Sequence, residues 1–266
     1  MGGAGHILRG VARVAAMALP PRCPGCGLVV DADHRFCARC WGGLRFLGDP
    51  ACAACRLPFD HHCGARAQCA ACIASPPRHS GIFAAVAYGP TARDIVLRLK
   101  YGGRGALAET IGRLVARQVP GHVELLVPVP LHRRRLWSRG FNQASLIAHA
   151  VSRCSVVPHD PFALRRTRAT PPLRGLGRRE RAKMVGSAFD VPAPARKRIA
   201  GRSIALVDDV YTSGATTDAC TRALLRAGAA RVTILCWARV IESDDDMAGD
   251  DPLSAHSLTS QVAHHR

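Results

Sequence analysis

Two adjacent carboxylates follow an apolar run in the segment Ile204–Ala219, IALVDDVYTSGATTDA. The apolar run predicts a buried strand, and the small and hydroxyl-bearing residues after it predict a turn into a helix. Backbone amides at a helix start bind anions such as phosphate, and a glycine in the turn lets the anion approach closely. Carboxylates accept hydrogen bonds from vicinal hydroxyl groups. The segment therefore predicts a site for a sugar phosphate such as a ribose 5-phosphate.

The plainer interpretation of this segment is an ordinary helix start, in which an acidic side chain caps the helix and stabilises its dipole. One aspartate would be enough for that role. Asp208 and Asp209 instead form a pair at the end of the predicted strand 204–207, shortly before the turn. We therefore favour a ligand site over a cap alone.

Basic side chains gather after a second predicted strand, 123–130. From Leu131 to Lys183 the chain carries thirteen Lys and Arg residues and two acidic ones. Because the guanidinium fork grips phosphate oxygens in pairs, this position suits a pyrophosphate group. The candidate residues are Arg133, Arg135 and Arg139, with Arg134 beside them. The alternatives are a solvated basic surface and a sequence-blind site for single-stranded DNA, for which only Trp137 and Phe141 supply nearby rings.

Nine of the twelve cysteines lie between positions 23 and 72. They include two quartets, each made of two CxxC turns. Ten residues separate the turns of the first quartet, and thirteen separate those of the second. The quartets are Cys23, Cys26, Cys37 and Cys40, then Cys52, Cys55, Cys69 and Cys72. Two such turns complete the thiolate tetrahedron of a structural zinc ion, whereas a disulfide framework would require an oxidising compartment. We predict one or two Zn²⁺ ions without a catalytic role, since closed sites leave no open coordination position. Replacement of a ligand by Cys63, beside His61 and His62, and crossed pairing between the quartets stay open.

Strands and helices alternate through the rest of the chain, which predicts an α/β fold with a mostly parallel sheet and flanking helices. The predicted strands are 82–88, 123–130, 202–209 and 231–240, and the predicted helices are 91–100, 107–119, 141–151 and 215–227. In such sheets ligands bind beyond the carboxyl ends of the strands, where the acid pair and the arginines both fall. The stretch 165–181 lacks periodicity and predicts a long loop that could act as a lid. For Lys100 and Tyr101 the default expectation is that the cation stabilises the end of its helix, with a substrate role as the alternative that no other sequence feature supports.

The formal charge of +18 over 266 residues suggests polyanionic partners. No apolar run is long enough to span a membrane. Residues 1–19 are mildly amphipathic, but Arg9 and Arg13 interrupt them and no export-signal cleavage site follows. We therefore expect a short docking helix, with a membrane-surface helix as the less favoured alternative, and a cytoplasmic protein.

At the acid pair the sequence resembles the type I phosphoribosyltransferases, whose signature is two acids, three residues and then Thr/Ser-Gly-x-Thr. The segment VPVPLHRRRLWSRGFNQASLIA, the arginine-rich stretch and the cysteines make the chain similar to the ComF family. Members of that family join a double zinc ribbon to a phosphoribosyltransferase domain and are linked to competence for DNA uptake. The resemblance implies that Asp208 and Asp209 contact the ribose hydroxyls of phosphoribosyl pyrophosphate, bound with Mg²⁺. It implies further that the 5-phosphate is held by Thr212, Ser213, Gly214, Ala215 and Thr216.

Two departures from the family pattern bear on activity. Pro172 and Met184 stand where the family's arginine-rich segment often has a glutamine and an asparagine. Thr212 stands where the 6-oxopurine phosphoribosyltransferases carry an aspartate base, and a hydroxyl cannot do that work near neutral pH. This argues against purine salvage, and no catalytic residue is assigned.

Two functions follow from this reading. The first is an enzyme that transfers a phosphoribosyl group to a nitrogen acceptor, and the second is a non-catalytic sensor or a DNA- or protein-binding module. The predicted domains are a docking helix over 1–19, a double zinc ribbon over 20–74, a linker over 75–81, a type I phosphoribosyltransferase-like domain over 82–242 and a disordered tail over 243–266.

Overall fold

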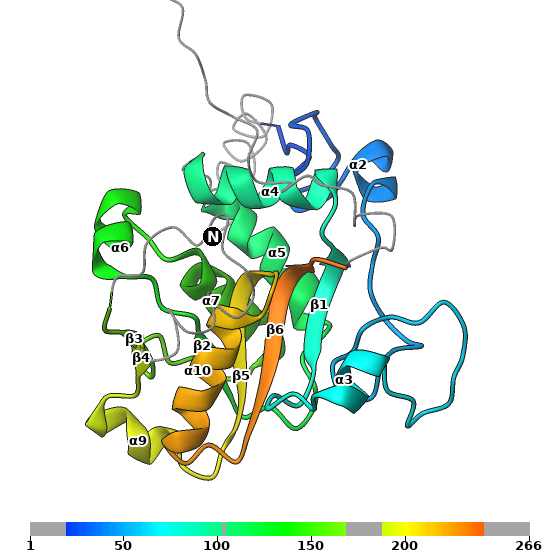
Figure 1. The fold of residues 1–266 in the computed structure, drawn as a ribbon. Coiled ribbons are helices and arrows are strands. Elements are labelled where there is room, and N and C mark those ends of the chain that lie inside the picture. Colours follow the sequence, from blue (N-terminus) through cyan, green and yellow to red (C-terminus); the bar gives the residue numbers. More distant parts are fainter. Residues whose placement is uncertain (1–19, 103–104, 169–187, 242–266) are drawn as a thin grey trace, which may run out of the picture.

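A four-stranded parallel sheet forms the centre of the computed structural model, which describes residues 20–102, 105–168 and 188–241 (Figure 1). The order across the sheet is β1 (Ile82–Ala87), β6 (Arg231–Arg239), β5 (Ser203–Tyr211) and β2 (Leu125–Pro128). Most strand residues are apolar and buried, as expected for a parallel sheet covered on both faces. The predicted α/β fold with a mostly parallel sheet is confirmed.

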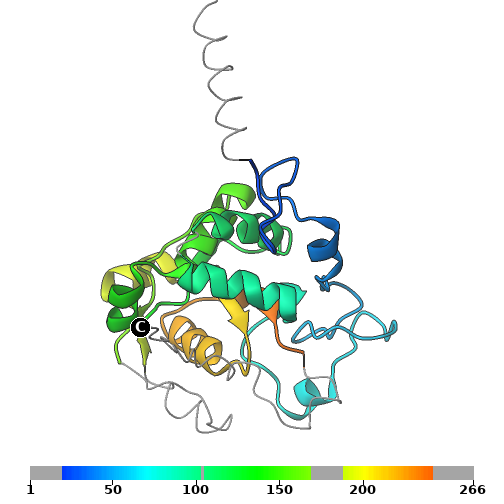
Figure 2. The ribbon, with the colours of Figure 1, turned by 90° about the horizontal axis from the view of Figure 1, so that it is seen from above.

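Helices cover the two faces of this sheet, and Figure 2 shows the two layers from above. One face carries α4 (Pro90–Tyr101), α5 (Ala106–Ala116) and α7 (Gln143–Ser155). The other carries α9 (Ala193–Ile199) and α10 (Ala215–Arg226). Alternate residues of β5 serve the two layers: Ala205 and Val207 pack in the first, and Ile204 and Leu206 pack in the second. Among the described residues, no helix has both the length and the apolar composition that crossing a bilayer requires.

Several predicted elements have different ends in the structure. The strand predicted over 123–130 is in register with β5 only from Leu125 to Pro128. The Val129 amide donates to the Val207 carbonyl (2.8 Å), and Pro130, which follows, has no amide hydrogen to donate. The helix predicted over 141–151 runs from Gln143 to Ser155. The Asn142 side chain accepts a hydrogen bond from the Ala144 amide (3.1 Å) and so caps its start.

Short elements complete the described chain. These are α2 (Ala38–Gly42), α3 (Ala70–Ala74), α6 (Arg133–Arg139), and β3 (Arg165–Arg166), which pairs antiparallel with β4 (Phe189–Asp190). The stretch predicted as a loop over 165–181 thus begins as a strand. Its larger part lies outside the described residues, as do the predicted helix 1–19, the predicted tail and positions 172 and 184.

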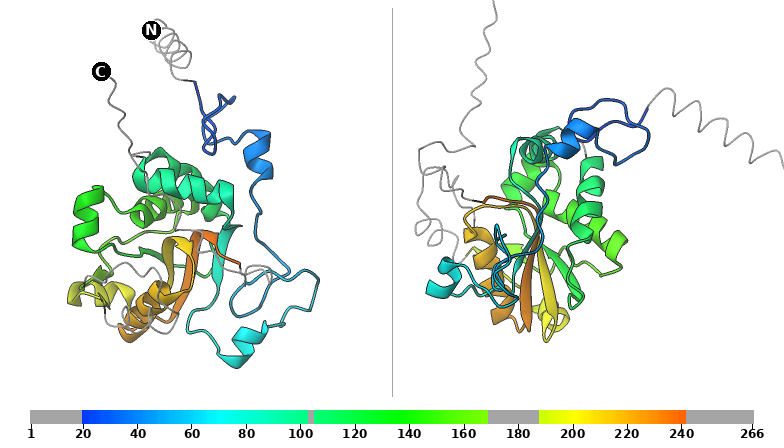
Figure 3. Two further views of the ribbon diagram at one scale, coloured as in Figure 1. Left: turned by 45° about the horizontal axis from the view of Figure 1, so that its top comes forward. Right: turned by 90° about the vertical axis from the view of Figure 1, so that its right-hand side faces the viewer.

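The cysteine-rich segment packs against the α/β part of the chain (Figure 3). Between its two quartets, residues 45–47 run beside the edge strand β1. The Leu47 amide donates to the Ala85 carbonyl (3.1 Å), and the Ala87 amide donates to the Arg45 carbonyl (2.8 Å). The otherwise open edge of the sheet is therefore covered there.

Candidate functional site

The acid pair lies within β5 and not at its end, because the strand runs on beyond both the 204–207 and the 202–209 ranges that the sequence predicts. β5 continues to Tyr211 because it stays paired with β6, where Asp208 is opposite Cys236. On its other side, β5 loses its neighbour at once, since the register with β2 ends at Pro128 opposite Val207. The two carboxylates therefore begin where β2 ends, at the carboxyl edge of the sheet.

The two carboxylates belong to opposite faces of the sheet, since neighbouring strand residues alternate. Asp209 continues the series of Ala205 and Val207 toward the face of α4, and its side chain is 8% exposed. Asp208 continues the other series toward α10. Burial and the nearby Asp208 charge raise the pKa of the Cys220 thiol on that helix. The two carboxylates therefore do not lie side by side on one face of the sheet. They flank the end of β5 from its two faces.

The Asp208 carboxyl keeps its proton to a higher pH than an ordinary aspartate. Burial and the Asp209 charge raise its pKa to about 7, against the opposing effects of the Asp209 amide, which donates to Oδ1 (2.9 Å), and of Lys100. A cation or a hydrogen-bond donor placed beside Asp208 would favour the ionised form. The site is therefore electrostatically suited to a ligand that carries hydroxyl groups or a metal ion.

Lys100 is a site residue that the sequence did not reveal. The sequence favours a helix-end role for it over a substrate role, yet its Nζ lies 3.0 Å from Oδ2 of Asp209. Burial opposes its charge, but the Asp209 carboxylate prevails and raises the pKa of Lys100. Next to it, Tyr101 is 74% exposed and lies under the Arg139 guanidinium, whose carbon is 5.2 Å from the ring centroid. Through these contacts the end of α4 joins the acid pair to α6.

The predicted phosphate turn leads directly into α10. Gly214 has φ +79°, a left-handed conformation that favours glycine, and a Cβ atom there would collide with the Tyr211 hydroxyl. The Gly214 carbonyl accepts from the Asp218 amide (2.8 Å) and the Thr217 hydroxyl (2.9 Å). The amides that precede Asp218 lie in the first turn of the helix, where no intrahelical acceptor is available. The turn thus has the local geometry of an anion site.

The predicted arginines lie on α6, which follows β2. Arg133 and Arg135 are exposed, and Arg139 is half-buried on the side of Tyr101. Burial and the charge of Arg135 lower the pKa of Arg166, whose guanidinium carbon is 5.5 Å from the Phe189 ring centroid. The structure therefore brings α6 close to the acid pair on one side and to β3 on the other.

The eight predicted cysteines form two tetrads, in each of which all sulfur atoms lie within 4.8 Å of one another. The Sγ atoms of Cys26 and Cys37 are 3.6 Å apart, and those of Cys55 and Cys69 are 3.8 Å apart. Four sulfurs at zinc-bonding distance in a tetrahedron are about 3.8 Å apart, so both tetrads fit Zn²⁺. The tetrads follow the two quartets without crossing, and Cys63 is exposed and belongs to neither.

In each tetrad, one cysteine has a lowered thiol pKa, which favours its thiolate form. Burial disfavours the charge of Cys23 and Cys52, but several backbone amides donate to each sulfur and lower the pKa of both thiols to about 6. These donors include the amides of Cys37 and Cys69, each 3.3 Å from its sulfur acceptor. Such amide donors are the support that a zinc–thiolate site needs.

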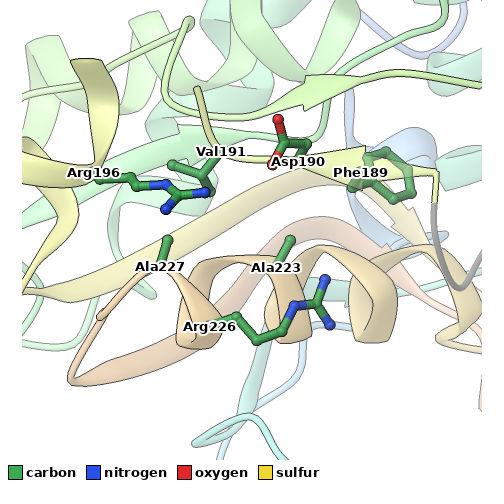
Figure 4. A pocket seen from close by; sticks show the side chains of 7 residues that line it. All are labelled: Phe189, Asp190, Val191, Arg196, Ala223, Arg226 and Ala227. Carbon is green, nitrogen blue, oxygen red and sulfur yellow. The ribbon is translucent and has the colours of Figure 1, made fainter. Parts of the chain in front are cut away.

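A small hollow lies at the other end of α10, away from the acid pair (Figure 4). Its floor includes Ala223 and Ala227, and Arg196 and Arg226 stand at its rim. Both arginines are exposed, and the neighbouring Asp190 pairs with Arg165 (2.8 Å). The hollow contains none of the predicted site residues.

Comparison with known proteins places these features in a family. Residues 14–73 match the double zinc ribbon domain. The DNA utilization protein YhgH of Escherichia coli (strain K12) is 31% identical over 234 residues, which cover 85% of this chain and 100% of that protein. Competence protein F of Haemophilus influenzae is 27% identical over 221 residues, covering 76% of this chain and 96% of the relative. Competence protein ComFC of Bacillus subtilis is 26% identical over 212 residues, covering 76% and 82%.

Among solved structures, a glutamine phosphoribosylpyrophosphate amidotransferase from Bacillus subtilis, complexed with ADP and GMP, aligns at 18% identity and a TM-score of 0.36. The alignment covers 52% of this chain and 30% of the other. The two cysteine tetrads and the parallel sheet together define a zinc-ribbon protein with an α/β domain. The similarity to the full length of YhgH shows further that the chain belongs to the ComF family.

Proposed function

We propose that this chain binds phosphoribosyl pyrophosphate with Mg²⁺ at the carboxyl edge of its sheet and transfers the phosphoribosyl group to a nitrogen acceptor. One observation carries the proposal: three kinds of group from separate elements meet at this edge. They are the acid pair of β5, the glycine turn before α10, and the cations Lys100 and Arg139. A sugar that carries hydroxyl groups, a phosphate and a pyrophosphate presents the complementary set.

Each group has a proposed role. The turn Thr212–Thr216 holds the 5-phosphate through amides and hydroxyls, and Asp208 and Asp209 accept hydrogen bonds from the ribose hydroxyls. The pyrophosphate is met by arginines of α6 and by Lys100, whose ammonium keeps donors to spare beside Asp209. Mg²⁺ fits this set because it prefers carboxylate, phosphate and water oxygens, and it would neutralise charge on the pyrophosphate.

In the proposed reaction the acceptor nitrogen forms a bond to ribose C1 as the bond from C1 to the pyrophosphate oxygen breaks. The electron pair of that bond leaves with the pyrophosphate. The cations of α4 and α6 stabilise this developing charge. Thr212 cannot act as a carboxylate base, so we expect an acceptor nitrogen that is nucleophilic without deprotonation by that residue.

The test is calorimetry of the full chain with phosphoribosyl pyrophosphate and Mg²⁺. Wild type should bind, and Asp209→Asn should abolish the signal. Asp190→Asn is the matched control, because Asp190 pairs with Arg165 away from the site and should leave binding unchanged. Pyrophosphate release across a panel of nitrogen bases then tests transfer. A wild-type protein that gives no binding heat contradicts the proposal.

A second candidate function, DNA handling, rests on a separate observation. Trp137 is 93% exposed on α6 between arginines, and an exposed ring beside cations is the combination that stacks single-stranded bases. Relatives of this chain are named for DNA utilization and competence. Trp137→Ala should weaken single-stranded DNA binding about tenfold, whereas Phe162→Ala, at a ring 78% exposed elsewhere, should not. Binding that does not change with salt concentration would exclude an electrostatic DNA site.

The domain boundaries follow the same proposal. We assign 20–74 to the double zinc ribbon, 75–81 to the connection and 82–242 to the phosphoribosyl-binding domain. In limited proteolysis, the zinc-loaded protein should be cut between these units more slowly than protein from which a chelator has removed the zinc. The reason is that cysteines of the second ribbon pack on the sheet.

A further inference from the structure

Arg239 is a buried cation at the carboxyl end of β6, with 7% of its surface exposed. Its backbone is held on both sides, since it lies opposite Ala87 of β1 and Tyr211 of β5. Within the described ranges, no carboxylate forms an ion pair with its guanidinium. A guanidinium removed from water needs a compensating negative group. One group in contact with it, the second cysteine tetrad, would carry negative charge as zinc-bound thiolates.

The Arg239 guanidinium contacts that tetrad at Cys55. Nη1 donates to the Cys55 carbonyl (2.7 Å), and Nη2 lies 3.6 Å from the Cys55 sulfur. Four thiolates around one Zn²⁺ carry a net charge of −2, which the guanidinium partly offsets. Donors to a ligand atom orient it and tune the affinity of a metal site. Arg239 is therefore placed to support the second zinc ion.

The same guanidinium also contacts the ring that borders the phosphate turn. Its carbon lies 5.6 Å from the ring centroid of Tyr211. The hydroxyl of that ring lies against Gly214, so closely that the glycine has no room for a Cβ atom. A continuous set of contacts therefore leads from Cys55 through Arg239 and Tyr211 to Gly214.

We propose that Arg239 is a positioning residue that couples the second zinc tetrad to the turn before α10. Zinc at this tetrad orders Arg239, the guanidinium holds the Tyr211 ring, and the ring sets the position of Gly214 and of the amides that follow. The ligand part of this inference rests on the proposed function of the turn. Because coupling between two sites is reciprocal, a phosphate ligand at the turn should in return slow zinc loss from the second tetrad.

The structural half is tested without any sugar ligand. Zinc transfer from the full chain to a chromogenic chelator and amide hydrogen exchange over 211–217 are measured for Arg239→Met. We expect about tenfold faster loss of one of the two zinc ions and faster exchange over 211–217. Arg56→Met is the matched control, because Arg56 also adjoins Cys55 and lies over a ring, Phe83 (5.3 Å), but pairs with Asp49. It should change neither quantity.

Tyr211→Leu removes the contact between Arg239 and the Tyr211 ring but keeps the contact between Arg239 and Cys55. It therefore tests the coupling even if Arg239→Met does not fold. This variant leaves the contact between Arg239 and Cys55 intact, so zinc loss should stay within about twofold of wild type while exchange over 211–217 rises. Unchanged exchange in both Arg239→Met and Tyr211→Leu would overturn the coupling. Unchanged zinc loss in Arg239→Met would overturn the support of the metal.

The ligand half is tested by calorimetry with phosphoribosyl pyrophosphate and Mg²⁺. Arg239→Met should bind about tenfold more weakly than wild type, and saturating ligand should slow zinc loss in wild type but not in Tyr211→Leu. Equal binding by wild type and Arg239→Met would overturn the coupling and leave the proposed function standing. A wild type without binding heat would overturn the proposed function, while the exchange measurement still decides whether tetrad and turn are coupled.

Discussion

The two cysteine tetrads are nearly the same within themselves and differ in what surrounds them. In each, the sulfur of the first cysteine accepts a hydrogen bond from the backbone amide of the third cysteine, at a distance of 3.3 Å. In each, burial raises the pKa of that first thiol, but backbone amide donors outweigh it and lower the pKa to about 6. The local metal chemistry of the two ribbons is therefore equivalent.

Their surroundings are not equivalent. The first ribbon docks on helices: His34 Nδ1 lies 2.9 Å from the Thr110 hydroxyl of α5, and a Cβ at Gly43 would meet Thr91 of α4. Cysteines of the second tetrad pack in one apolar cluster with Ile82 and Cys236 of the sheet. The second ribbon thus covers part of a sheet face as a helix would, and it reaches the strand end that carries the acid pair.

Loss of the second metal should have the larger effect of the two. Cys52→Ser should remove zinc binding worth about 10 kcal/mol and uncover the sheet, so that cooperative unfolding and ligand binding are lost together. Cys23→Ser should lose one zinc ion but keep a cooperative transition and ligand binding. Zinc content, thermal unfolding and calorimetry measure these differences. Equal loss in both variants would mean that the ribbons play the same structural part.

The buried ion pair at the carboxyl edge of the sheet and an exposed ion pair of the first ribbon should also differ in their contribution to stability. Lys100→Met leaves the Asp209 carboxylate buried and unpaired, which should lower the free energy of unfolding by about 3 kcal/mol. Arg35→Met breaks an ion pair of the first ribbon whose side chains are 65% and 70% exposed, and should cost less than about 1 kcal/mol. Urea unfolding measures both. Lys100→Met combined with Asp209→Asn should recover part of the loss, and no recovery would place the effect of Lys100 elsewhere.

The turn beside the second ribbon should tolerate a methyl group poorly. Gly214→Ala places an alanine in a left-handed backbone conformation and forces Tyr211 to shift. We therefore expect the free energy of unfolding to fall by about 2 kcal/mol. Gly201→Ala is the control, because Gly201 has a similar φ of +73° but open space around its Cβ position, and it should cost about 1 kcal/mol. Tyr211→Phe should reduce the cost of Gly214→Ala in denaturant unfolding. Equal costs at the two glycines would show that the Tyr211 contact is soft.

Ligand affinity should depend on pH through Asp208. Its folded pKa of about 7 lies above the usual value of 3.8, so the ionised acceptor is lost as pH falls below 7. Below pH 7, affinity for the Mg²⁺ complex should increase with increasing pH, by up to about tenfold per pH unit. Above pH 7 it should become constant. Calorimetry at several pH values measures this, with Asp208→Asn as the control for titration of the ligand. The same slope in that variant would assign the titration to the ligand.

The same raised pKa makes a prediction for stability. Below the unfolded value of 3.8 the group is neutral in both states, and between 3.8 and about 7 the folded state binds more protons. The contribution of Asp208 to folding therefore falls as pH rises through this window and is constant above it. Unfolding measured in Asp208→Asn should lack that part of the pH dependence.

Much of this molecule could be predicted because its signals are local. The zinc ligands follow from CxxC spacing, and the strands of the parallel sheet follow from apolar runs. The glycine turn follows from residues within a few positions of one another. Lys100 and Arg239 could not be found in this way. Arg239 bonds to a residue 184 positions away, and no periodicity links such distant positions.

By itself, the sequence determined the two metal tetrads, the parallel α/β sheet and a turn suited to phosphate, because spacing and periodicity encode local geometry. Tertiary structure alone decided that Asp208 and Asp209 serve opposite faces, that Lys100 neutralises Asp209, and that the second tetrad touches the strand end through Arg239. Those outcomes depend on strand register and on which faces pack together, and packing brings together groups whose separation along the chain carries no signal.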